Sequence, residues 1–84
     1  MLIFKLENTD LRSPHNWNIT VDRDGEYTHY FGLEQFAKGW FMLTDGPLHE
    51  QRAGRTVHWQ RNFTHSDPAD VLSYAVKFLR QKLG

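Results

Sequence analysis

The last segment of the chain has the pattern of an amphipathic helix, and this pattern constrains the fold most because such a helix needs an apolar surface to cover. Asp67 is a residue type that caps helices, and Pro68 suits a first helical position, where no N–H is needed. At about 100° per residue, the apolar side chains form one stripe: Val71, Leu72, Ala75, Val76, Phe78, Leu79 and Leu83. The sequence therefore predicts a helix over residues 67–83 that packs against a sheet.

Three earlier segments alternate apolar and polar residues, as half-buried strands do. They are residues 2–7, with Leu2, Phe4 and Leu6 on one side; residues 17–22, with Trp17, Ile19 and Val21 on one side; and residues 56–64, with Val57, Trp59 and Phe63 on one side. Antiparallel sheets commonly have one packed and one solvated face. We therefore expect these apolar sides to form the floor for the helix.

Residues 22–26 connect the second of these segments to an aromatic stretch, and they allow two hairpin registers. A two-residue loop at Asp24 and Gly25 places Thr28 and Tyr30 on the apolar face. A type I turn that starts at Asp22, with a bulge at Gly25, instead places Tyr27, His29 and Phe31 there. We favour the second register because it adds aromatic side chains to a face that is already apolar.

Residues 33–44 fit two kinds of secondary structure. Leu33, Phe36, Ala37 and Trp40 have helical spacing, whereas residues 40–43 also fit a buried strand. We favour a short helix over 33–43, followed by a strand over 48–52 that turns at 53–54 into the strand over 56–64. The predicted order is β-β-β-α-β-β-α. This is a single two-layer α+β domain over residues 1–84, in which an antiparallel sheet of four to five strands packs against the C-terminal helix.

Composition narrows the class of protein further. The chain has 84 residues, which is material for one core, and no cysteine. Without cysteine there is no thiolate chemistry, cysteine-ligated zinc or iron–sulfur cluster, and a disulfide-stapled secreted domain is disfavoured. The apolar start at residues 1–4 is too short for an export signal or a membrane span. We therefore expect a cytoplasmic protein that does not contact a membrane.

The residue types that bind metals are present, but their spacing does not indicate a site. The five histidines are His15, His29, His49, His58 and His65, and no two of them have the spacing of a ligand pair on a helix. Asp22, Asp24 and Glu26 resemble part of a calcium loop but lack its remaining ligands. The sequence predicts neither a metal nor a cofactor.

Catalytic groups are likewise not arranged as a reaction needs. Ser13 lies near His15, and Ser66 lies between His65 and Asp67, but a catalytic triad is assembled across a fold and rarely from neighbours in sequence. Phosphate-binding and dinucleotide-binding motifs are also missing from the sequence. We therefore expect no enzymatic activity.

The candidate binding residues are on the polar side of the strand over 56–64 and in the segment before it. His58, Gln60 and Asn62 fall opposite the apolar side, and Arg52 and Arg55 precede them. Such amides, imidazoles and guanidinium groups can recognise peptide groups, base edges, phosphates or carboxylates. The alternative is an ordinary solvated sheet face. Trp40, with Phe41 and Met42, is a candidate aromatic anchor for a partner.

Charge distribution leaves two functions open. Formal charge is zero, but residues 1–50 contain eight acidic and four basic residues, and residues 51–84 contain two acidic and six basic ones. We predict a small non-catalytic protein-binding module, such as a regulator, inhibitor or adaptor of the kind that phages and mobile elements encode. The alternative is a nucleic-acid-binding protein that uses the basic region 52–64.

Overall fold

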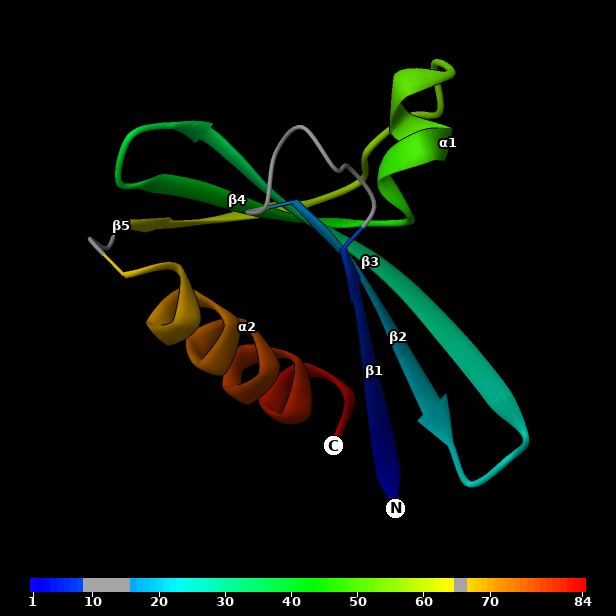
Figure 1. Cartoon of the computed structure of the whole chain (residues 1–84). Coiled ribbons are helices and arrows are strands. Elements are labelled where there is room, and N and C mark those ends of the chain that lie inside the picture. Colours follow the sequence, from blue (N-terminus) through cyan, green and yellow to red (C-terminus); the bar gives the residue numbers. More distant parts are fainter. Residues whose placement is uncertain (9–15, 65–66) are drawn as a thin grey trace.

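The computed structural model describes residues 1–8, 16–64 and 67–84, and Figure 1 shows how its elements are arranged. These residues form one five-stranded sheet from β1 (Leu2–Asn8), β2 (Trp17–Arg23), β3 (Tyr27–Ala37), β4 (Trp40–Asp45) and β5 (Gln60–Thr64). A short helix, α1 (Leu48–Arg52), lies between β4 and β5, and a longer helix, α2 (Pro68–Leu83), follows β5. The strands are neighbours in sequence order, and every pair is antiparallel.

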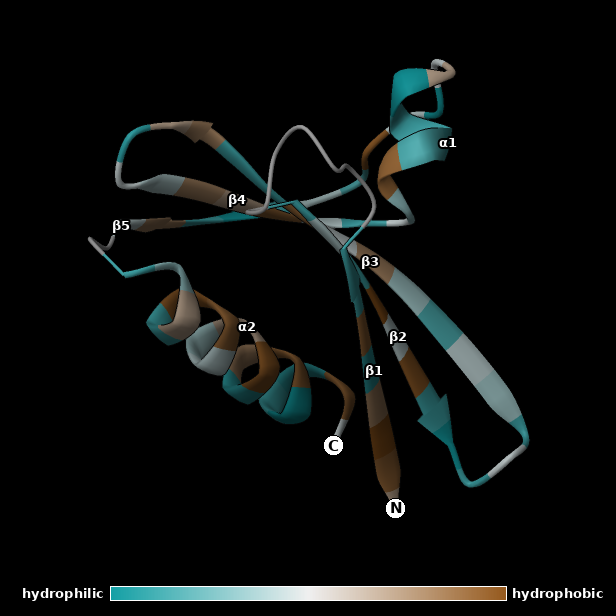
Figure 2. Cartoon of the chain, viewed as in Figure 1, coloured by the Kyte–Doolittle hydropathy of each residue, from teal (hydrophilic) through white to brown (hydrophobic). Residues whose placement is uncertain are grey.

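The predicted layout of a sheet covered by the C-terminal helix is confirmed. Helix α2 covers one face of the sheet, here called the inner face, and α1 lies on the other, the outer face (Figure 1). In Figure 2 the apolar bands of α2 lie toward the sheet. The core between them consists of Ile19, Val21, Phe31, Leu33, Phe41, Leu43, Val71, Ala75 and Leu79. Asp67 caps α2 as expected, since its carboxylate accepts a 3.0 Å hydrogen bond from the N–H of Ala69.

The favoured register of the first hairpin is also confirmed. Val21 lies opposite His29 and Arg23 lies opposite Tyr27, so the odd-numbered aromatic residues of β3 share the inner face. The expected type I turn starting at Asp22 is wrong, because the N–H of Glu26 donates to the carbonyl of Arg23 at 2.9 Å and the two residues between them, Asp24 and Gly25, both have positive φ (+53° and +73°). The turn is therefore centred on Asp24 and Gly25, as in the alternative, while the strands keep the favoured register.

The helix expected over residues 33–43 is wrong. This segment is a β-hairpin, in which β3 continues to Ala37 and β4 begins at Trp40. Leu33 lies opposite Leu43, and both are fully buried on the inner face. In the hairpin, Leu33 and Leu43 bury their side chains against each other across the strands. A short helix in this segment would be destabilised by Gly39.

The strand expected over residues 48–52 is also wrong, because this segment is helix α1. Leu48 is the reason, since its side chain is buried against the outer face at Gly32. A β carbon added to Gly32 would lie 2.5 Å from Leu48 Cδ2, so only glycine lets the helix approach this closely. The observed order is therefore β-β-β-β-α-β-α.

The last strand is shorter than the predicted 56–64. It begins at Gln60, and residues 55–59 have no regular secondary structure. Trp59 and Phe63 pack against the core as expected, but Val57 is exposed. In the part of the chain that the structure describes, neither helix has the length and apolarity that crossing a membrane requires.

Candidate interaction surface

The open part of the outer face lies over β3, β4 and β5. Trp40 lies opposite Thr64, Met42 opposite Asn62, and Thr44 opposite Gln60. Residues directly opposite each other project from the same face. The structure therefore brings three predicted binding residues together, namely Trp40, Gln60 and Asn62. We call this surface the outer patch; it consists of Glu34, Phe36, Trp40, Met42, Gln60, Asn62 and Thr64.

Two aromatic side chains supply large apolar surface at one end of the outer patch, next to the β3–β4 turn. The rings of Phe36 and Trp40 lie 6.3 Å apart, and the residues are 50 % and 46 % exposed. Phe36 was not among the predicted anchors, although it had the same helical spacing as Trp40 in the expected helix over 33–43. Phe41, which was among them, is 1 % exposed and belongs to the core, so that prediction is wrong.

Helix α1 borders the outer patch on one side. Its first N–H, from Leu48, donates to the side-chain oxygen of Asn18 at 2.9 Å, which ties the helix to β2. Arg52 at its last turn lies 3.9 Å from the carboxylate of Glu34. This predicted binding residue therefore lies at the border of the patch, with its charge next to an acidic neighbour.

The other two predicted residues, Arg55 and His58, are held by Asp45 at the end of β4. The carboxylate of Asp45 accepts hydrogen bonds from the backbone N–H groups of His58 (2.8 Å) and Trp59 (3.2 Å). It also pairs with the guanidinium of Arg55 at 3.2 Å, and Arg55 reaches Glu50 at 3.5 Å. These contacts fasten the loop before β5, so Arg55 and the backbone of His58 have a structural role.

Asp45 is ionised more readily than an ordinary aspartate. Burial alone raises the pKa of its carboxyl group, but the hydrogen bonds from Trp59, His58 and Arg55 outweigh burial and lower that pKa below its usual value. The pKa of Asp24 is also lowered, because the N-terminal ammonium group of Met1 donates a hydrogen bond to it and carries the opposite charge.

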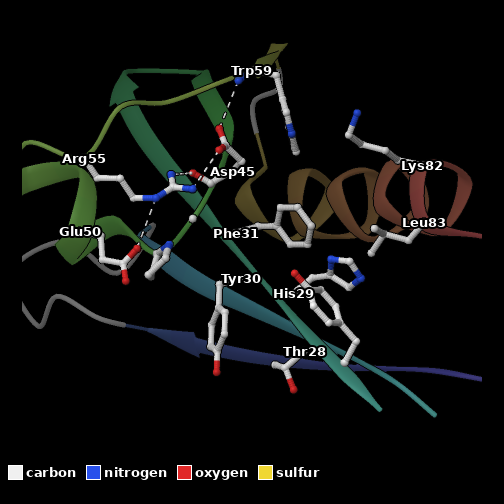
Figure 3. Close-up of a pocket in the computed structure, with 13 residues that line it drawn as sticks. Thr28, His29, Tyr30, Phe31, Asp45, Glu50, Arg55, Trp59, Lys82 and Leu83 are labelled. Carbon is white, nitrogen blue, oxygen red and sulfur yellow. Dashed lines mark hydrogen bonds and ion pairs between the residues drawn. The ribbon is translucent and has the colours of Figure 1, made fainter. Parts of the chain in front are cut away.

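A hollow of about 380 Å³ lies beside this cluster, between β3 and the end of α2 (Figure 3). Phe31, Trp59 and Leu83 contribute apolar surface to it, and Arg55 and Asp45 lie at its border. Figure 3 shows these charged groups turned toward each other. The charges of Asp45 and Arg55 are already paired with each other. Lys82, which also lines the hollow, lies over the ring of Trp59 at 4.8 Å.

The structure brings no metal-ligating set together in the part of the chain it describes. Within residues 1–8, 16–64 and 67–84, no three His, Cys, Asp or Glu side chains are grouped so that they could hold an ion. Ser13, His15, His65 and Ser66, whose pairings the sequence argues against as catalytic sites, lie outside the described residues.

Comparison with known proteins adds no family to this description. Neither the protein-family models, nor the curated proteins, nor the solved structures give a match to this chain.

Proposed function

We propose that this chain is a small, non-catalytic, cytoplasmic protein-binding module that contacts its partner through the outer patch. The observation that supports the proposal is the pair Phe36 and Trp40, two large aromatic side chains that remain about half exposed although the chain has an apolar core elsewhere. Large aromatic residues with polar neighbours are typical anchors of protein interfaces. The lack of cysteine supports the cytoplasmic part of the proposal.

The chemistry of the outer patch indicates what kind of protein surface it fits. Gln60 and Asn62 supply uncharged amide donors and acceptors on the same face, with Asn62 opposite Met42 and Gln60 farther along the strands, opposite Thr44. The single carboxylate of the patch, Glu34, lies near Arg52. An uncharged partner surface with an apolar side chain to place against Phe36 and Trp40 fits this arrangement.

The positions of the arginines favour this proposal over nucleic-acid binding. Arg52 lies next to Glu34, and Arg55 lies next to Asp45 and Glu50. Arg61 lies on the inner face, where its guanidinium is 5.6 Å from the ring centre of Phe78. A phosphate backbone requires cations that face it together. Region 52–64 therefore does not present its three arginines to one ligand.

The proposal is tested by affinity capture from the native host with the full chain and two variants. Trp40→Ala removes an anchor of the outer patch, and Tyr74→Ala removes a comparably exposed aromatic from α2 as a matched control. Circular dichroism establishes that both variants fold. We expect the wild type and Tyr74→Ala to recover the same stoichiometric protein, and Trp40→Ala to recover it at least about tenfold less well.

Three results would count against the proposal. These are equal recovery by Trp40→Ala, loss of the partner with Tyr74→Ala but not with Trp40→Ala, and recovery that nuclease treatment abolishes. The last of these would favour the nucleic-acid alternative, particularly if binding weakened steeply with added salt.

A further inference from the structure

Strand β1 is the first strand of the sheet, so one of its backbone edges faces away from β2. The N–H of Gly46 donates to the carbonyl of Tyr30 at 2.8 Å, so the backbone groups of Tyr30 point toward β4. Backbone groups alternate between the two sides of an antiparallel strand. Tyr30 lies opposite Thr20 of β2, and Thr20 lies opposite Lys5 of β1. Because the backbone groups of Tyr30 point away from β2, those of Thr20 point toward β1 and those of Lys5 point toward β2. The backbone groups of Phe4 and Leu6, on either side of Lys5, therefore point outward. No strand among the described residues pairs with that side.

An apolar groove runs between this edge and α2. Leu6 from β1 lies on one side of it and Leu72 and Val76 from α2 on the other, and the groove encloses about 380 Å³. Leu6 is 43 % exposed although it projects from the inner face. The edge therefore combines the outward backbone groups of Phe4 and Leu6, which no described strand pairs with, and apolar surface that the described residues leave exposed.

The charge beside the groove has one sign. Lys77 and Arg80 line it together with the apolar residues. In the described part of the chain neither of them pairs with a carboxylate, and the guanidinium of Arg80 lies over the ring of Phe4 at 4.7 Å. An acidic group that approaches the edge would meet both cations.

We propose that the β1 edge binds an extended, acidic peptide segment of another protein by adding it as a sixth strand. Exposed strand edges bind peptides through main-chain hydrogen bonds, and alternate side chains give specificity. The peptide residue opposite Leu6 projects toward Leu72 and Val76 and is apolar. The residue opposite Phe4 projects toward Arg80 and is acidic. This surface is separate from the outer patch, so the inference stands independently of the proposed function.

The same observations disfavour two other occupants. A second copy of the chain, paired through β1 about a two-fold axis, would bring the cationic sides of two α2 helices together, and like charges repel. A nucleic acid could contact the cations, but it has no peptide groups that could pair with the alternating N–H and C=O groups of a strand edge. An extended acidic peptide uses the edge, the groove and the charge together.

The probe is a synthetic peptide, acetyl-Thr-Glu-Thr-Val-Thr-Glu-Thr-amide, titrated into the full chain and followed by nuclear magnetic resonance. Its pattern reads the same in both directions, so either strand orientation places valine opposite Leu6 and a glutamate two residues away. We expect chemical-shift changes along β1 and residues 72–80, and slower amide exchange at Phe4 and Leu6. A control peptide has lysine in place of both glutamates, and we expect it to bind at least about tenfold more weakly.

Two sets of variants test separately how much the cations and the backbone edge contribute to peptide binding. Reversing both cations, with Lys77→Glu and Arg80→Glu, should weaken peptide binding at least about tenfold, whereas Lys38→Glu in the β3–β4 turn should leave it unchanged. Leu6→Pro removes an N–H that points away from β2, so the sheet keeps its own hydrogen bonds. It should bind the peptide more weakly than Leu6→Ala, which keeps that N–H.

Several results would overturn the inference. They are equal binding of the lysine peptide, shifts centred outside β1 and α2, and no saturable shift at millimolar peptide. A single-stranded oligonucleotide that displaces the peptide from Lys77 and Arg80 would assign the surface to nucleic acid instead. Concentration-dependent shifts at β1 without peptide would assign it to a second copy. Trp40→Ala should not affect peptide binding, so failure here is distinguishable from failure of the proposed function.

Discussion

The carboxylate of Asp45 binds residues that come ten or more positions later in the chain. It accepts the backbone N–H groups of His58 and Trp59 and pairs with Arg55. Gly46 next to it has φ of +83°, and a β carbon there would meet the guanidinium of Arg55. The end of β4 and the loop before β5 are therefore locked together by charge-assisted hydrogen bonds, which are stronger than neutral ones.

The first prediction concerns the pH dependence of this lock. Because the pKa of Asp45 is lowered in the folded state, its carboxylate stabilises the fold above its unfolded pKa of about 4. That contribution is lost as the pH falls through the lowered folded pKa. At neutral pH, Asp45→Asn should lower the free energy of unfolding by about 1–3 kcal/mol, and the difference from wild type should shrink below about pH 4.

Urea unfolding at a series of pH values measures this difference. Glu26→Gln, which neutralises an exposed carboxylate in the first hairpin turn, is the control and should have little effect. A difference for Asp45→Asn that stayed constant down to about pH 2 would contradict the assignment.

At the scale of elements, α1 depends on one close approach to the sheet. Leu48 is buried over Gly32 of β3, and Gln51 donates from its side chain to the carbonyl of Gly46 at 3.1 Å. The helix has only five residues, and isolated helices of this length are not stable in water. Its existence therefore follows from packing and not from helix propensity.

The second prediction tests this packing with a double-mutant cycle. Gly32→Ala should lower the free energy of unfolding by about 1–3 kcal/mol, because the added methyl group overlaps Leu48. In a Leu48→Ala background the overlap is removed, so Gly32→Ala should cost distinctly less. Chemical denaturation of the four proteins measures both values. Equal costs in the two backgrounds would show that Gly32 acts through its backbone and not through α1.

At the scale of the whole molecule, zero formal charge conceals an uneven distribution. Arg61, Lys77, Arg80 and Lys82 lie on the side of α2, and three of them lie over aromatic rings and not beside carboxylates. Ion pairs gather instead around α1 and β4, where Arg52 and Arg55 meet Glu34, Asp45 and Glu50. Two of these four cations, Lys77 and Arg80, line the groove beside the β1 edge.

The third prediction follows from this crowding of cations. Lys77→Glu places an acidic residue three positions before Arg80 on α2, and such pairs stabilise a helix by about 0.2–0.5 kcal/mol. The variant should therefore unfold at a slightly higher temperature than wild type. The gain should be larger at about 10 mM than at about 1 M salt, because salt screens surface charges. A lower unfolding temperature would contradict the prediction. It would also require the peptide-binding loss of the doubly charge-reversed variant to be reassessed for stability.

The outer patch was only partly predictable from sequence. Gln60 and Asn62 were correctly placed together because strand alternation is a local property. Arg55 was predicted to contact a ligand, but its carboxylate partner Asp45 is ten residues away, and no local pattern shows that contact. Phe36 was missed because its exposure depends on whether residues 33–43 are helix or strand.

Local sequence was enough to predict the features whose causes lie within a few residues. These are the cap and apolar stripe of α2 and the apolar sides of the strands; for the β2–β3 hairpin it allowed two registers and favoured the observed one. That residues 33–37 and 40–45 form a hairpin and residues 48–52 form a helix depends on contacts in the folded molecule. The apolar spacing from Leu33 to Trp40 satisfies either a helix or two strands. The choice depends on burying Leu33 against Leu43 and Leu48 against Gly32, which are contacts between residues far apart in sequence.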